Sequence, residues 1–128
     1  MGKGKKKDRS ETKKAESASI GAEEIMGQYL LAFGAGAGTM RVRRVAVTAL
    51  RERYLPCIQA ALDESPELWD TQGSQVLYFV GVIGQLAALR TLESGQHAID
   101  GDVAMAAAEK VERESRDAML KGCPWCPW

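Results

Sequence analysis

The last six residues of the chain, CPWCPW, hold the side chains with the most evident chemistry. Cys123 and Cys126 have the Cys-x-x-Cys spacing that supplies two of the four ligands of a structural zinc site. The other two ligands would have to come from Cys57 and from His97, the only histidine of the chain, or from a second copy's tail. The sequence therefore leaves a zinc site open at Cys123 and Cys126, as an alternative to a docking role for the same peptide.

The docking role depends on the two tryptophans of this peptide, Trp125 and Trp128. Pro124 and Pro127 prevent a helix from continuing through these residues. A tryptophan at such a terminus reduces its exposed apolar area only by lying on the folded body or on a partner. We therefore predict a C-terminal peptide over residues 122–128 that docks through Trp125 and Trp128.

Charge is distributed unevenly along a chain whose 17 basic and 17 acidic residues cancel. Residues 1–14 hold seven basic and two acidic residues, a balance of +5, so the remaining residues carry −5. Clustered lysines neutralise phosphates and release counterions, and residues 1–20 lack apolar periodicity. We expect a disordered basic tail whose contacts with nucleic acid come from Lys3, Lys5, Lys6, Lys7, Arg9, Lys13 and Lys14. The alternative is a leader that only aids solubility.

A second basic cluster lies inside the body of the chain. Its members predicted to contact nucleic acid are Arg41, Arg43, Arg44 and Arg51. Helical spacing would place Arg44 and Arg51 on one face, so one basic strip could extend the tail's binding surface. The alternative is a solvated helix face whose arginines pair with acids such as Glu23 or Glu64.

The glycine-rich stretch FGAGAGT, residues 33–39, has the composition of a phosphate-binding loop. Its spacing fits neither the dinucleotide-binding nor the Walker pattern, and a helix rather than a strand precedes it. We therefore expect a hinge between two helices. The chain also lacks a nucleophile with a base at a recognisable spacing, so we expect no enzymatic activity.

The longest apolar run, residues 76–89, is about 14 residues, whereas a membrane-spanning helix needs roughly 20. No apolar segment follows the N-terminal lysines, so the pattern is not that of a secretory signal. We expect a protein of the cytoplasm, nucleoid or nucleus without membrane contact.

The body, residues 21–121, has helical periodicity throughout, so we predict an all-α bundle of about four helices and no sheet. The first helix should end at the glycines of 34–38. The second should begin near Thr39, reach about Leu62, and kink or break at Tyr54 and Leu55 because Pro56 removes a hydrogen bond. The fourth should follow Asp100 as its cap.

The third helix, predicted over residues 67–94, is the central one. Its apolar residues surround the helical wheel, which indicates burial on more than one side, in the core or at a subunit interface. Gly73, Gly81 and Gly84 leave shallow places where another helix can approach closely. We therefore expect self-association, as a homodimer, or a protein partner.

Residues 75–111 resemble the second half of a histone fold, with a long helix, a short loop and the sequence HAIDGDVAMAAAEKV. The same Ile-x-x-Asp-Val-x-x-Ala pattern recurs in the lid domains of AAA+ ATPases. The histone resemblance implies a handshake dimer in which basic residues of the loops and helix starts meet phosphates. Here the matching positions hold His97, Asp100 and Asp102, which favours those relatives that pair with proteins.

Together these patterns predict a non-enzymatic helical binding module. Its tail would hold a polyanion, nucleic acid in the first place, and its body would self-associate. The alternative is a scaffold or accessory subunit of a larger assembly, without nucleic-acid contact, that docks through CPWCPW.

Overall fold

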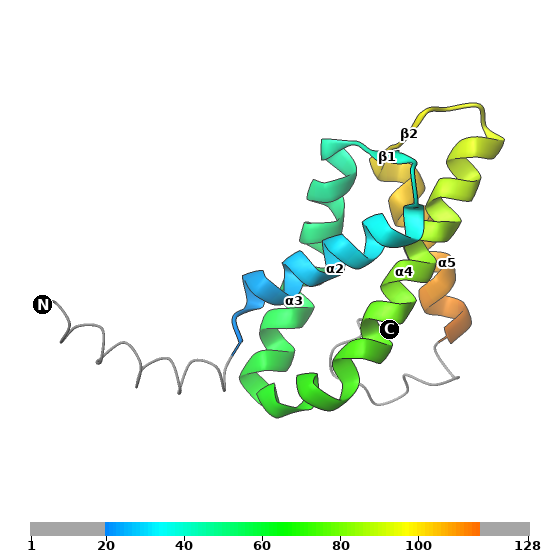
Figure 1. Ribbon diagram of the computed structural model, residues 1–128. Helices are drawn as coiled ribbons and strands as arrows, with labels where there is room; N and C mark the ends of the chain where they lie inside the picture. The colour runs from blue at the N-terminus through cyan, green and yellow to red at the C-terminus, as the bar shows by residue number, and fades with distance from the viewer. Residues whose placement is uncertain (1–19, 116–128) are drawn as a thin grey trace, which may run out of the picture.

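The computed structural model of the chain describes residues 20–115, which form a small all-α bundle as predicted (Figure 1). Its helices are α2 (Ala22–Ala37), α3 (Arg44–Glu64), α4 (Trp69–Glu93) and α5 (Gly101–Ser115). A 3-10 turn, η1 (Pro66–Leu68), joins α3 to α4, and Pro66 occupies its first position as expected. The lysine tail, the two terminal cysteines and the two terminal tryptophans lie outside the described residues.

Helix α2 begins as its sequence indicates, with Glu23 and Glu24 in the first turn and the Gly21 amide donating to the Glu24 carboxylate at 3.2 Å. The sequence predicted that this helix ends at the glycines of residues 34–38, but Gly34 and Gly36 lie inside the helix. The helix continues to Ala37 and ends at Gly38, whose φ of 68° favours glycine. The glycines before Gly38 are therefore part of a helix and do not form a hinge.

Helix α3 differs from its prediction at two points. It begins at Arg44 rather than near Thr39, because the chain first forms a short strand. It also continues through Pro56 to Glu64 without a break. Pro56 lies on the exposed side of α3, where water can hydrogen-bond to the carbonyl that lost its intrahelical partner.

A two-stranded parallel sheet corrects the prediction that the chain contains none. Strand β1 (Arg41–Val42) pairs with β2 (Ala98–Ile99), with Arg41 opposite Ala98 and Val42 opposite Ile99. The Arg43 amide adds a hydrogen bond of 2.9 Å to the Ile99 carbonyl. Strands of two residues are too short to produce a visible alternation in the sequence.

The described chain consists of two equivalent helix–strand–helix units. The paired strands are offset by 57 residues (98 − 41), and so are the two glycines of positive φ, Gly38 and Gly95. The same offset relates the first residues of α3 and α5, Arg44 and Gly101. The units α2–β1–α3 and α4–β2–α5 therefore pack as a pair, although few identical residues relate them.

The centre of the fold is a close crossing of α2 and α4 (Figure 1). A Cβ atom placed on Gly36 would lie 1.9 Å from the Gly81 carbonyl oxygen, and one on Gly84 would lie 2.0 Å from the Phe33 carbonyl oxygen. The predicted close approach at Gly81 and Gly84 is thus confirmed. The space at Gly73 instead receives the indole of Trp69 from the same helix.

The core lies between the four helices and is continuous along α4. Val76, Val80 and Ile83 of α4 are buried and lie on one face of the helix, so the prediction that this helix is buried on more than one side is wrong for a single copy of the chain. Near η1, Tyr29 stacks on Trp69 at 6.3 Å and lies 5.5 Å from the Tyr54 ring. One side of α4 remains exposed, however, and the apolar character of its sequence extends to that side.

Among the described residues, the segment 66–93 is long and apolar enough to cross a membrane by length and composition alone. A third of its most apolar window is buried inside the fold. The core helix of a soluble bundle passes the same test, so this finding is compatible with the central position of α4 in the bundle.

The helix crossing leads to a first prediction. Gly36→Ala should lower the free energy of unfolding by about 1–3 kcal/mol, because its methyl group would overlap the Gly81 backbone. Gly34→Ala, two residues away in the same helix, meets nothing within 4 Å and should raise it by up to about 1 kcal/mol. Urea denaturation of the two variants measures both changes. Equal effects of the two substitutions would contradict the crossing.

Candidate polyanion-binding surface

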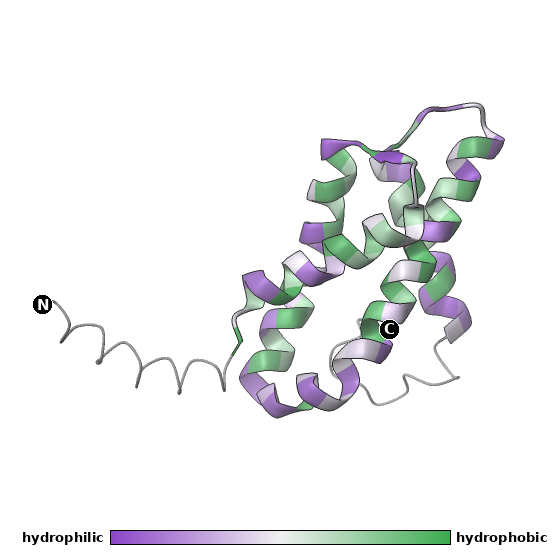
Figure 2. Ribbon diagram, in the orientation of Figure 1, coloured by the Kyte–Doolittle hydropathy of each residue, from purple (hydrophilic) through white to green (hydrophobic). Residues whose placement is uncertain are grey.

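Three arginines surround strand β1 and the start of α3. Arg41, Arg43 and Arg44 are exposed, and none of them has an acidic partner among residues 20–115. Figure 2 shows hydrophilic colour on the segment that joins β1 to the start of α3, at the end of the bundle where the strands pair. We call these three residues the arginine cluster.

The arginine cluster lies at the positive end of a helix dipole. The position before α3 is Arg43, which provides no side-chain cap, and the first turn contains no acidic residue. Cations at a helix N-terminus are unfavourable, whereas anions are stabilised there by the dipole and by free backbone amides. A bound anion would relieve this local conflict.

The equivalent position in the second unit has the opposite character. Asp100 precedes α5 as predicted, and its carboxylate accepts a hydrogen bond of 2.9 Å from the amide of Gly101, the first residue of the helix. Asp102 follows in the first turn, and His97 is exposed in the preceding loop. The start of α5 thus has its own carboxylates, and among the α-helices of residues 20–115 only α3 has no acidic residue in its first turn.

Arg51 does not join the arginine cluster. Its guanidinium donates to both carboxylate oxygens of Glu23 on α2, at 2.9 and 3.0 Å. The hydrogen bond from Arg51 lowers the pKa of the Glu23 carboxyl group. The predicted alternative, a helix face whose arginines have acidic partners, therefore describes Arg51, while the other three remain unpaired.

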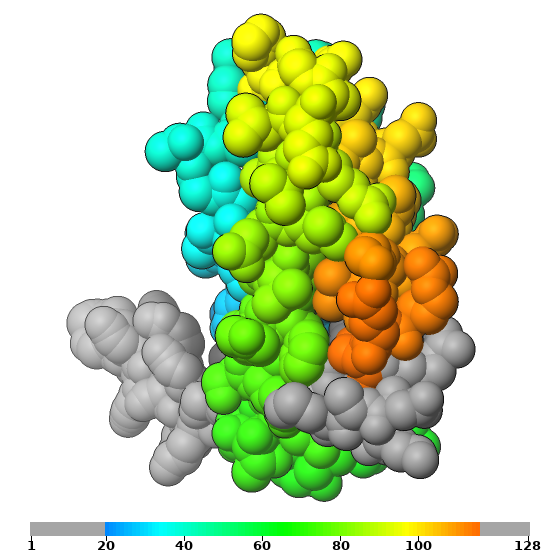
Figure 3. Space-filling model, turned by 90° about the vertical axis from the view of Figure 1, so that its right-hand side faces the viewer, coloured from blue at the N-terminus to red at the C-terminus, as the bar shows by residue number. Residues whose placement is uncertain are grey.

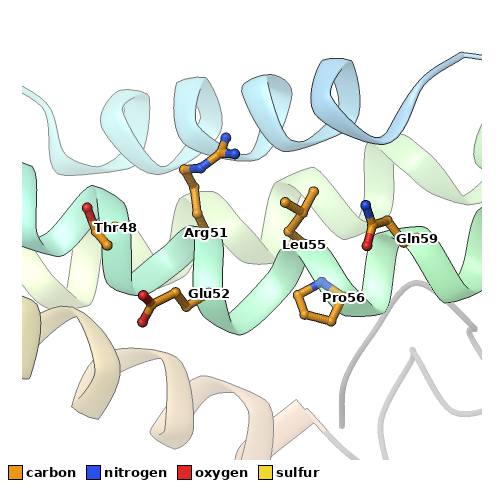
Figure 4. A pocket seen from close by; sticks show the side chains of 6 residues that line it. All are labelled: Thr48, Arg51, Glu52, Leu55, Pro56 and Gln59. Carbon is orange, nitrogen blue, oxygen red and sulfur yellow. The ribbon is translucent and has the colours of Figure 1, made fainter.

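A shallow depression on the outer side of α3 contains Arg51 and apolar neighbours (Figure 4). Arg51 reaches from α3 toward α2, and Glu52 points to the opposite side of the helix. Leu55 and Pro56 complete the lining with Thr48 and Gln59. Its polar groups do not converge on one point, so the depression lacks the geometry of a reaction site.

The sequence reasoning missed a buried ionic cluster between α3 and α5. The Glu112 carboxylate, 5% exposed, accepts hydrogen bonds from Arg53 Nε at 2.9 Å and from the Tyr54 hydroxyl at 2.6 Å. Arg53 Nη2 donates to its other oxygen. We call these three residues the α3–α5 clamp.

The feature of the sequence that could have indicated the clamp is the position of Glu112 on the apolar face of α5. That face carries Ala104, Ala108 and Val111, and Glu112 follows Ala108 by one helical turn. Lys110 of the same helix pairs with Glu114 at 2.6 Å on the surface. An acidic residue at apolar spacing is an indication of a buried partner.

The clamp does not form a reactive centre with Cys57, the one cysteine among the described residues. Burial and the nearby Glu112 carboxylate raise the pKa of the Cys57 thiol, so the reactive thiolate is disfavoured. Across residues 20–115, no three His, Cys, Asp or Glu side chains are grouped to hold a metal ion. The predicted zinc ligands Cys123 and Cys126 lie outside these residues.

Comparison of the chain with family models, with curated proteins and with solved structures finds no match. The functional interpretation therefore depends on the arginine cluster, the clamp and the exposed face of α4.

The clamp gives a prediction for alkaline pH. Burial, with the Glu112 carboxylate beside it, raises the pKa of the Tyr54 hydroxyl far above its ordinary 10.0. The folded state therefore keeps a proton that the unfolded chain releases, and this contribution to stability is complete below pH 10 and lost as the pH rises above it. The free energy of unfolding should fall by up to about 1.4 kcal/mol per pH unit there.

Tyr54→Phe should make this decline shallower, because phenylalanine has no hydroxyl proton to release. At neutral pH, Tyr54→Phe should cost about 1–3 kcal/mol because Glu112 loses a hydrogen bond. Urea unfolding of dilute protein on both sides of pH 10 measures these values. A Tyr54→Phe profile as steep as that of the parent chain would show that Tyr54 does not control the alkaline decline.

Proposed function

We propose that the chain is a non-enzymatic helical module that binds a polyanion, specifically nucleic acid, and self-associates through its body. The observation that carries the proposal is the arginine cluster at a helix start that has no acid of its own. Residues 20–115 contain eight basic and thirteen acidic residues, and the arginine cluster gathers three of these eight basic residues at one end of the body. Backbone amides at the α3 start would add to their attraction for a phosphate.

The basic tail supports the same function. Its charge of +5 would contribute the sequence-independent part of the affinity through counterion release, and the arginine cluster would hold the phosphates at a fixed place. In this proposal Arg51 is a structural residue, because Glu23 occupies its guanidinium.

The resemblance to a histone fold belongs to this proposal. The paired strands β1 and β2 lie beside the starts of α3 and α5, and basic residues at loops and helix starts are those that meet phosphates in that fold. The arginine cluster would contact phosphate at the start of α3. At the start of α5, the carboxylates of Asp100 and Asp102 would repel it. The proposed contact is therefore one-sided.

A second candidate is an accessory subunit that binds only proteins. It is favoured by the apolar side chains that α2 and α4 leave exposed, including Leu31, Tyr78 and Leu92. In this case the tail would serve solubility, and the chain would not bind DNA or RNA.

Salt dependence of binding to duplex DNA and to RNA distinguishes the two candidates. Arg41→Gln/Arg44→Gln should weaken binding and reduce the slope of log affinity against log salt concentration by about 0.9 for each phosphate that the variant no longer neutralises. The control Lys110→Gln/Arg113→Gln removes the same charge from α5 and should leave the slope unchanged. A chain that lacks residues 1–14 should show a larger reduction of the slope.

Absence of binding by the full chain at low salt would eliminate the nucleic-acid function. Equal weakening in the two double variants would mean that net charge, rather than the arginine cluster, determines affinity. Full affinity without residues 1–14 would show that the tail does not contribute to nucleic-acid binding. It would leave the proposed role of the arginine cluster unchanged.

A further inference from the structure

The side of the bundle where α2 and α4 lie next to each other is apolar and exposed. On α4, Tyr78, Val82, Leu89 and Leu92 follow one another at helical spacing, and Tyr78 and Leu92 are 66% and 65% exposed. Leu31 of α2 is 75% exposed. Figure 3 looks at this side of the molecule, with α4 along its length and α2 beside it. We call it the α2/α4 face.

A groove with a floor of small residues crosses the α2/α4 face. Ala32, Ala35 and Gly36 of α2 and Gly81 of α4 form its bottom, because the two helices touch there through their backbones. Larger side chains, among them Tyr78, border it. The face therefore presents a hollow and a projecting aromatic side chain within the same surface.

The α2/α4 face differs from the rest of the surface in having few charged residues along α4. Over residues 74–92, α4 holds no ionisable group other than the Tyr78 hydroxyl and the half-buried Arg90. The remainder of the described body is densely charged, with an excess of acidic residues. Two copies of a body of like charge would meet with the least repulsion on this face, and an apolar strip of such length usually marks an interface.

We propose that the α2/α4 face binds a second copy of this chain, so that two α4 helices pack antiparallel about a twofold axis near the groove. A twofold interface uses the same patch on both copies, and the patch must therefore be complementary to itself. Here the Tyr78 ring of each copy fits the small-residue groove of the other. The antiparallel arrangement also opposes the two helix dipoles favourably.

This inference deepens the self-association of the proposed function and does not depend on nucleic-acid binding. It differs from a handshake that would exchange whole helices between copies, because each copy keeps its own pairing of β1 with β2 and of α2 with α4. The interface would consist of surface side chains alone. Substitutions there should change association and leave each copy folded.

Charge substitution at Tyr78 in the full chain tests the proposal. Tyr78→Lys and Tyr78→Glu should each raise the dissociation constant of the dimer at least about a hundredfold, because like charges meet beside the twofold axis. An equal mixture of the two variants should restore association, because lysine then faces glutamate. Sedimentation velocity over a range of concentrations measures each state, in buffer without nucleic acid.

Val45→Glu and Val45→Lys provide matched controls, because Val45 is 56% exposed but lies at the start of α3. They should leave association unchanged, and thermal melts should show that all four variants fold. A monomeric parent chain, or a dimer that both Tyr78 variants leave intact, would overturn the proposal. Variants that dissociate but do not associate when mixed would exclude the twofold arrangement. A chain that forms the dimer but does not bind DNA or RNA would contradict the proposed nucleic-acid function and leave the dimer proposal standing.

Discussion

The arrangement of this bundle depends on the backbone contact between α2 and α4. At Gly36 and Gly84 the opposite helix occupies the space that a Cβ atom would need, so these two helices approach more closely than side chains normally allow. The contact brings the two helix–strand–helix units together and places β1 beside β2. It also produces the small-residue groove on the outer side of the same crossing. The core, the β1–β2 pair and the groove on the α2/α4 face thus all depend on the contact between α2 and α4.

The second pair of helices is joined by different chemistry. Between α3 and α5, Arg53, Tyr54 and Glu112 form a buried polar cluster in place of a backbone contact. The 57-residue offset places Lys110 at the position of Arg53 and Val111 at that of Tyr54. The two units therefore share a backbone arrangement while their side chains have different roles. A buried carboxylate with two partners fixes how the units align, because loss of either partner would leave an uncompensated polar group.

The sequence predicted the features that a single helix encodes, and failed where a contact with another element decided the outcome. The acidic first turn of α2 and the Asp100 cap of α5 are local signals, and both appear in the structure. Gly34 and Gly36 have low helix propensity but lie inside α2, and at Gly36 packing against α4 leaves no space for a Cβ atom. Strands of two residues leave no pattern. The sequence named Glu23 among the acids that could pair with the arginines, but no spacing rule assigns it to Arg51 in particular.

The two proposed surfaces lie on different parts of the molecule, and this separation has a consequence for binding. The arginine cluster is at the end of the bundle where β1 and β2 pair, whereas the α2/α4 face follows the sides of the helices. A dimer through that face would keep both arginine clusters accessible and join them in one particle. A polyanion long enough to reach both clusters would bind the second as an intramolecular step, at a high effective concentration. Each folded body would contribute three arginines in addition to its basic tail, so the proposed self-association would let two acidic bodies hold one phosphate backbone at two fixed places.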